Sequence, residues 1–163
     1  MVDSNVARIR PADEKSFRLA PHNIEAEQAL LGAILVNNEA FYRVSDFLLG
    51  EHFYEPVHRE IYEIAGKIIR AGKAATPITV KTYLPDQLVA EMSMPQYLAR
   101  LAAEATTVLN AADYGQAVYD LAIRRTLIQI GEEMTSTAYD ADVEMTAPKQ
   151  IEEAEKQLFD LAE

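Results

Sequence analysis

Two short stretches of the sequence hold residue types that could perform acid–base or metal chemistry. In PHNIEAE, His22 precedes two carboxylates, Glu25 and Glu27. In EPVH, Glu55 and His58 are three residues apart, a spacing that places both side chains on one face of a helix. Di-iron sites of helical bundles use two such Glu-x-x-His pairs with two further carboxylates. The sequence offers one pair, so a helical metal-dependent enzyme is one hypothesis and a purely structural role is the other.

The structural interpretation of the same residues is a set of helix starts. Asn23 is a good N-cap, and Glu25 and Glu27 suit the positive end of the helix dipole. Glu55 would cap the next helix or favour its start through the dipole, with His58 on an outer or half-buried face. The sequence lacks cysteine, an H-x-x-x-H pair, a G-x-S-x-G turn and a glycine-rich phosphate loop. We therefore predict no catalytic, cofactor-binding or metal-binding residue in this chain.

Apolar residues recur at helical spacing throughout the chain, and strand-like alternation is nearly absent. The clearest helix begins at Pro56 and is stopped by Gly72, which suits a left-handed C-terminal cap. A long proline-free stripe runs from residue 110 to about residue 139, and a final amphipathic stretch follows over 148–163. Further helices are expected over 24–36, within 37–49, around 80–84 and from 95 to 101.

These patterns predict an all-α protein, in which a compact globule of short helices is followed by a long antiparallel helical hairpin. We expect a flexible tail over 1–20, the globule over 21–108 and the hairpin over 109–163. The apolar stripe of the last helix would be exposed unless something covers it. The hairpin is therefore expected to pack against another molecule, or the chain is part of a longer one.

The candidate interface residues lie on the two stripes of the hairpin. They are Tyr114, Val118, Leu121, Arg124, Arg125, Ile128, Ile151, Leu158 and Leu161. Adjacent arginines occur once in the chain, at Arg124 and Arg125, midway along the long helix. Ion pairs to neighbouring acids on a solvated face and a contact to a partner subunit are both compatible with this pair.

The charge balance favours a protein partner over nucleic acid. The net charge is −11, and eight acidic residues between positions 139 and 163 are accompanied by two lysines. Nucleic-acid binding draws most of its affinity from Lys and Arg that neutralise phosphates, so strong DNA binding by this chain alone is not expected. No stretch is typical of a signal peptide or a membrane span, and a chain without cysteine is compatible with a cytoplasmic location.

Six motifs, in order along the chain, resemble the N-terminal domain of the bacterial replicative DNA helicase, the DnaB family. They are P-x-N-x-E-A-E-x-x-x-L-G-x-x-L at 21–35, F-Y-x-x-x-H-x-x-I-Y at 53–62, T-V-x-x-x-L at 79–84, Y-L-x-x-L at 97–101, N-A-x-x-Y at 110–114 and R-R-x-L-I at 124–128. The sequence departs from the family at two loops. It reads MSMPQYL where the family often has a glycine pair, and ATPITV where an aspartate is common.

The resemblance implies an all-α globule whose hairpin pairs with that of a second copy, within a hexamer built from three dimers. It also implies that primase binds here through its C-terminal domain, and it allows a helicase loader as a further partner. In that family ATP, Mg²⁺ and 5′→3′ unwinding belong to a separate C-terminal RecA-like domain, whose Walker motif this sequence lacks. A stand-alone adaptor with the same fold is the alternative.

Overall fold

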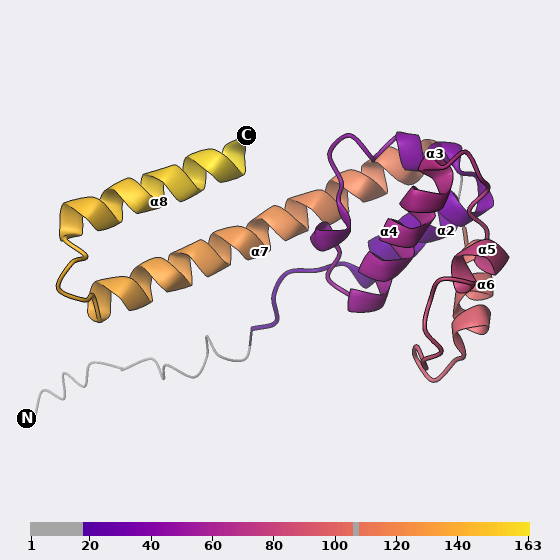
Figure 1. Cartoon of the computed structure of the whole chain (residues 1–163), viewed down its shortest axis with the longest axis horizontal. Helices are drawn as coiled ribbons and strands as arrows, with labels where there is room; N and C mark the ends of the chain where they lie inside the picture. Colours follow the sequence, from indigo (N-terminus) through magenta and orange to yellow (C-terminus); the bar gives the residue numbers. More distant parts are fainter. Residues whose placement is uncertain (1–17, 106–107) are drawn as a thin grey trace, which may run out of the picture.

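Figure 1 shows a helical globule, from which two long helices extend as a hairpin. The computed structural model of the chain describes residues 18–105 and 108–163. Within these residues all regular structure is α-helix or 3-10 helix, apart from an isolated bridge between Val89 and Met92. The predicted all-α class is confirmed. Of the predicted flexible tail over 1–20, residues 1–17 lie outside the described part of the chain.

Short helices come first along the chain, and two long helices follow. The globule contains α2 (Ile24–Val36), α3 (Glu39–Tyr42), η1 (Gly50–His52), α4 (Pro56–Arg70), α5 (Pro77–Lys81), α6 (Met94–Ala103) and η2 (Val108–Asn110). The hairpin is made of α7 (Ala111–Tyr139) and α8 (Ala147–Ala162). None of the described helices is both long and apolar enough to cross a bilayer.

Local side chains set where the helices begin and end. Asn23 accepts a hydrogen bond from the Ala26 amide (3.0 Å), as predicted for an N-cap. Thr76 caps α5, so this helix begins at Pro77, earlier than the predicted position around 80–84. After α4 the chain turns at Gly72, whose φ of +76° is the left-handed conformation predicted there.

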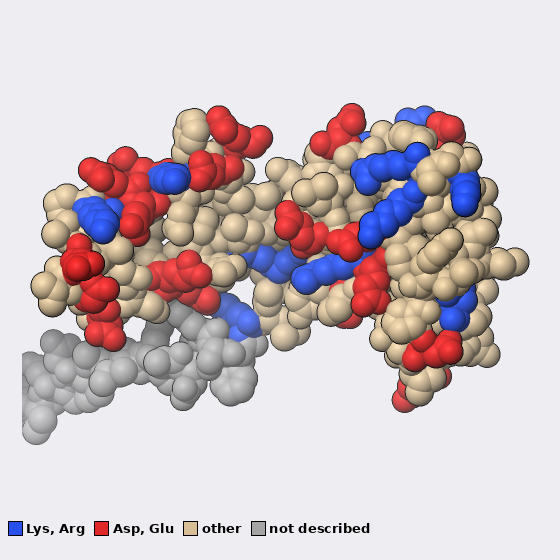
Figure 2. Space-filling view, in the orientation of Figure 1, with Lys and Arg blue, Asp and Glu red and all other residues tan. Residues whose placement is uncertain are grey.

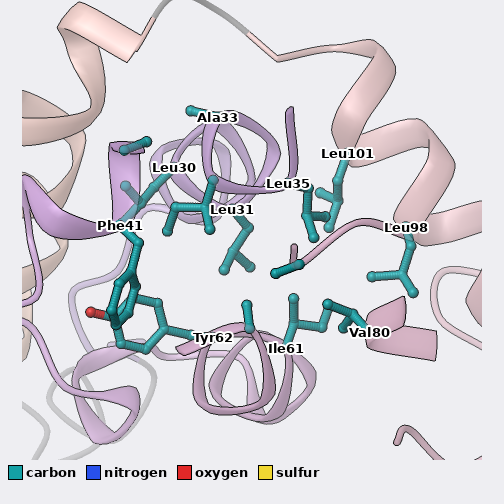
Figure 3. Packing of buried hydrophobic residues seen from close by; sticks show 14 of the residues in the cluster. Leu30, Leu31, Ala33, Leu35, Phe41, Ile61, Tyr62, Val80, Leu98 and Leu101 are labelled. Carbon is teal, nitrogen blue, oxygen red and sulfur yellow. The ribbon is translucent and has the colours of Figure 1, made fainter. Parts of the chain in front are cut away.

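The central helix of the globule is α2, which packs against α4, α6 and α7. Its Leu30, Leu31 and Ile34 side chains are at most 1 % exposed. Figure 3 shows the α2 leucines facing Ile61 and Tyr62 of α4 across the core. Burial of these apolar side chains is the main source of stability for the globule.

The hairpin is continuous with the globule, because α7 begins inside it. Ala111, Val118 and Ala122 on the first half of α7 are buried, and Ile130 is the last buried residue of this helix. Beyond that point α7 projects from the globule and packs with α8 (Figure 1). The sequence boundary proposed at residue 109 therefore lies just before a helix that the globule and the hairpin share.

A tight turn before α6 holds two non-glycine residues in the left-handed region. Ala90 has a φ of +49° and Glu91 has a φ of +65°, between the bridge partners Val89 and Met92. This conformation costs an L-residue about 1–2 kcal/mol. The turn directly precedes the segment in which the sequence departs from the glycine pair of the family it resembles.

Glu91→Gly is expected to stabilise the fold by about 0.5–1 kcal/mol, because glycine adopts the left-handed conformation without the Cβ clash but loses more entropy on folding. Urea unfolding followed by circular dichroism measures the change. Gly72→Ala is the matched opposite substitution and should cost about 1 kcal/mol. A less stable Glu91→Gly variant would contradict the strain assigned to this turn.

Candidate interaction surface on the helical hairpin

The two stretches that could hold chemistry meet in the core of the globule. Glu27 on α2 and His58 on α4 are each 1 % exposed, and the Glu27 carboxylate accepts a hydrogen bond from His58 Nδ1 (2.8 Å). The same carboxylate accepts from the backbone amides of Tyr54 (2.8 Å) and Glu55 (3.3 Å) at the start of α4. His58 Nε2 lies 2.5 Å from the Tyr97 hydroxyl on α6. One buried network therefore ties α2, α4 and α6 together.

The hydrogen bonds of this network satisfy its own buried side chains, which is typical of a structural cluster. Burial raises the pKa of the Tyr97 hydroxyl, which keeps its proton and donates to His58, while Gln28 donates to the Tyr97 oxygen (3.3 Å). Each buried side-chain nitrogen or oxygen of the described residues has a hydrogen-bond partner. Within 18–105 and 108–163, no group of three or more His, Asp or Glu side chains is placed to hold a metal ion. Because the members of the cluster are almost fully buried, a substrate cannot reach them.

One expectation for these residues was wrong, because His58 lies in the core rather than on an outer or half-buried face. Glu55 is the N-cap residue of α4, as expected, but its side chain makes no capping hydrogen bond, and the Glu27 carboxylate accepts from the amides at the start of this helix. The sequence carried a signal for this arrangement, because Glu27 is four residues before Leu31 and His58 is three residues before Ile61, on core-facing stripes. A charged residue on an apolar stripe needs a buried partner.

Arg125 is engaged within its own chain. Its guanidinium donates to the backbone carbonyls of Pro21 (2.8 Å) and His52 (2.7 Å). The guanidinium carbon also lies 5.5 Å from the centre of the Tyr54 ring, on which His22 stacks at 4.1 Å. Arg125 therefore holds the segment before α2 and the end of η1 against α7, and we leave it out of the proposed interface.

An apolar groove lies between α7 and α8 on the projecting part of the hairpin. Its volume is about 410 Å³, and its only polar lining residues are Gln150 and Glu155. The other lining residues are Met134, Ala138, Ala147, Ile151, Ala154 and Leu158. Ile151 is 60 % exposed and Leu158 is 44 % exposed, which is high for apolar side chains grouped in one groove. Nothing in the described part of the chain covers this groove.

The structure separates the other predicted interface residues into two groups. On the first half of α7, Val118 is in the core, and Tyr114 and Leu121 are partly buried. Arg124 forms a surface ion pair with Asp120 (2.8 Å) one turn away. The second group lies on the hairpin helices beyond that part, with Ile128 on α7 and with Ile151, Leu158 and Leu161 on α8.

A comparison with protein families decides what kind of domain this is. The family model described as the DnaB-like helicase N terminal domain matches residues 19–120. The chain belongs to this family. The resemblance inferred from the six sequence motifs is therefore confirmed, and the match extends from the segment before α2 into α7.

Curated relatives of this DnaB-family domain are replicative helicases. The chain is 48 % identical over 161 residues to the replicative DNA helicase DnaB of Rickettsia felis, an alignment that covers 98 % of this chain and 33 % of that protein. It is 35 % identical over 155 residues to the replicative DNA helicase DnaB of a Nostoc species, covering 91 % of this chain and 17 % of that protein. The chain thus spans about a third of the length of its rickettsial relative.

Solved structures of DnaB proteins share the fold. The N-terminal domain of DnaB helicase from Mycobacterium tuberculosis is similar with a TM-score of 0.75 and 25 % identity, over 87 % of this chain and 99 % of that one. A DnaB-like replicative helicase, described with its interactions with primase, is similar with a TM-score of 0.66 and 25 % identity. That similarity covers 85 % of this chain and 31 % of the helicase chain.

Proposed function

We propose that this chain is the part of a replicative DNA helicase that joins the subunits and receives primase. The uncovered apolar groove on the hairpin carries the proposal, because such a surface needs a protein partner in water. Membership of the DnaB-like N-terminal family and the fold shared with DnaB structures support it. ATP and Mg²⁺ binding and 5′→3′ DNA unwinding would belong to the rest of a longer protein.

Self-association would use the hairpin grooves of two copies. A second hairpin laid across α7 and α8 would cover Ile151 and Leu158 in a four-helix arrangement, and three such dimers would form a hexamer. Figure 2 shows acidic side chains gathered over the hairpin. From position 132 to 163 the sequence has ten acidic residues and two lysines. Two such hairpins repel each other, so dimerisation should strengthen as salt screens their charge.

The primase contact would use the same acidic part of the molecule. Opposite charges steer association and set orientation, so the C-terminal domain of primase should present basic residues to the hairpin. The DnaB-like replicative helicase that shares this fold is described with its interactions with primase, which supports the proposal. A helicase loader is a further partner in keeping with this role, and the protein would work at the replication fork in the bacterial cytoplasm.

Leu158→Glu is expected to raise the dissociation constant of the dimer by about tenfold or more, because burial of a leucine contributes about 1.5–3 kcal/mol and the new carboxylate adds repulsion. Leu158 is 44 % exposed in the single chain, so the fold should be retained. Sedimentation equilibrium measures the constant. Val143 is fully exposed in the loop before α8, so Val143→Glu adds the same charge outside the groove and should leave the dissociation constant of the dimer within about twofold.

Isothermal titration calorimetry with the C-terminal domain of the cognate primase tests the second half of the proposal. Binding that weakens with added salt and with Leu158→Glu is the expected result. A chain that stays monomeric at high concentration and releases no heat with primase at about 50 μM would exclude this function.

A further inference from the structure

A second groove lies on the globule, between the C-terminal half of α4 and the segment after α5. Its volume is about 360 Å³. It is lined by Ile64, Lys67, Ile68, Ala71, Lys73 and Tyr83. Tyr83 is 64 % exposed although it borders the apolar residues Ile64 and Ile68 of the groove. In contrast to the hairpin groove, all the charged residues of this globule groove are cations.

The two lysines of the globule groove are available to a ligand. Among the described residues, neither Lys67 nor Lys73 forms an ion pair. Lys67 lies in the last turn of α4, where the helix dipole favours a cation. Lys73 lies beyond the helix end, so the helix dipole does not account for this cation. Of the apolar lining residues, Ile68 belongs to the core and Ile64 is partly buried, whereas Tyr83 is exposed. Figure 2 shows most of the visible Lys and Arg side chains on the globule, away from the hairpin tip.

The chemistry of the globule groove excludes several kinds of occupant. Nucleic acid is disfavoured, because the two lysines of the groove offer few phosphate contacts. A two-fold contact between two globules would place lysines against lysines across the interface. A hairpin of a second copy has the right charge, but in the proposed dimer its apolar groove is already covered by another hairpin.

We propose that the groove between α4 and Tyr83 binds an acidic amphipathic helix of another protein. Apolar side chains on one face of that helix would lie on Ile64, Ile68 and Tyr83, and flanking carboxylates would pair with Lys67 and Lys73. Tyrosine is a frequent anchor in such contacts because it buries a large ring at low entropic cost.

The position of the globule groove gives it a separate role from the hairpin. Figure 1 shows α5 at the end of the molecule farthest from the loop that joins α7 and α8. A partner on the globule groove would therefore leave the hairpin groove open. The domain could hold an acidic helix at one end while the hairpin binds a second hairpin or another protein at the other.

Nuclear magnetic resonance with the ¹⁵N-labelled full chain tests this proposal. The probe is a capped helical peptide of about 18 residues, with leucines along one face and glutamates elsewhere. We expect its addition to shift the amide signals of α4 and of the residues around Tyr83. Lys67→Glu/Lys73→Glu should weaken binding by about tenfold or more, and Tyr83→Ala by a similar factor. The matched control, Lys149→Glu/Lys156→Glu on α8, should change it by less than about twofold.

Any of the following outcomes would overturn the proposal. A peptide with lysines in place of the glutamates that binds as well, or no shift at about 1 mM peptide, would exclude an acidic partner. Shifts centred on α7 and α8 would assign the peptide to the hairpin groove. A different outcome is that the amide signals of α4 shift when the concentration of the chain alone is raised, and that the peptide reverses this shift. This result would identify a second copy as the occupant. Circular dichroism checks that the variants, whose substituted side chains are exposed, remain folded.

Discussion

Glu27→Ala is expected to lower the free energy of unfolding by about 3–5 kcal/mol, a large part of the stability of an ordinary domain. The change removes the acceptor for His58 Nδ1 and for the backbone amides of Tyr54 and Glu55. These donors then stay buried without partners, and the missing side chain leaves a cavity among packed residues. Urea unfolding at neutral pH, followed by circular dichroism, measures the loss.

Two further variants distinguish the contribution of the buried network to stability from the general effect of removing a carboxylate. Glu25→Ala removes an exposed carboxylate from the same helical turn and should change stability by less than about 0.5 kcal/mol. Glu27→Gln keeps the shape and one acceptor oxygen, so an intermediate loss of about 1–3 kcal/mol is expected. A loss below about 1 kcal/mol for Glu27→Ala would show that the network contributes little.

Gly32→Ala should destabilise the fold by about 2–3 kcal/mol, even though alanine is the better helix former. A Cβ at Gly32 would lie 2.2 Å from the carbonyl oxygen of Leu101 and 3.1 Å from its carbonyl carbon. Because both are backbone atoms, α6 as a whole has to move away from α2. That movement also carries Tyr97 away from His58, so the substitution weakens the buried network. Thermal and urea unfolding both report the loss.

Gly131→Ala provides the matched control on α7. Beyond its chain neighbours and the backbone of its own helix, no atom of the described residues lies within 4 Å of a Cβ built at Gly131, and the residue is exposed on the projecting part of α7. The same substitution should therefore stabilise the chain by about 0.5–1 kcal/mol, through helix propensity alone. Equal effects at the two glycines would contradict the close packing of α2 on α6.

Local features explain which parts of the fold could be predicted. The N-cap at Asn23, the left-handed turn at Gly72 and the helical class all follow from interactions within a few residues of chain. The family resemblance rests equally on local motifs and is confirmed by the match over 19–120. The expected interface set does not include Met134, which lines the hairpin groove, and alanines of that lining such as Ala138 give a weak apolar signal in the sequence.

The partners of polar residues depend on contacts that the sequence pattern does not encode. Glu27 and His58 are 31 positions apart, and the periodicity of each helix shows which face is apolar without showing which charged residue lies opposite. Arg125 reaches Pro21 across 104 positions, a contact within the chain that helical periodicity does not indicate.

The sequence by itself therefore determined the all-α class, the start of α2, the end of α4 and the family, because these depend on local periodicity, caps and motifs. Only the tertiary structure decided that the two suspected chemical stretches form one buried structural cluster. It also decided which apolar stripes remain uncovered, because exposure depends on how α2, α4, α6 and α7 pack together. The first half of α7 is covered by that packing and the part beyond Ile130 is not, which is why the hairpin is the candidate interaction surface.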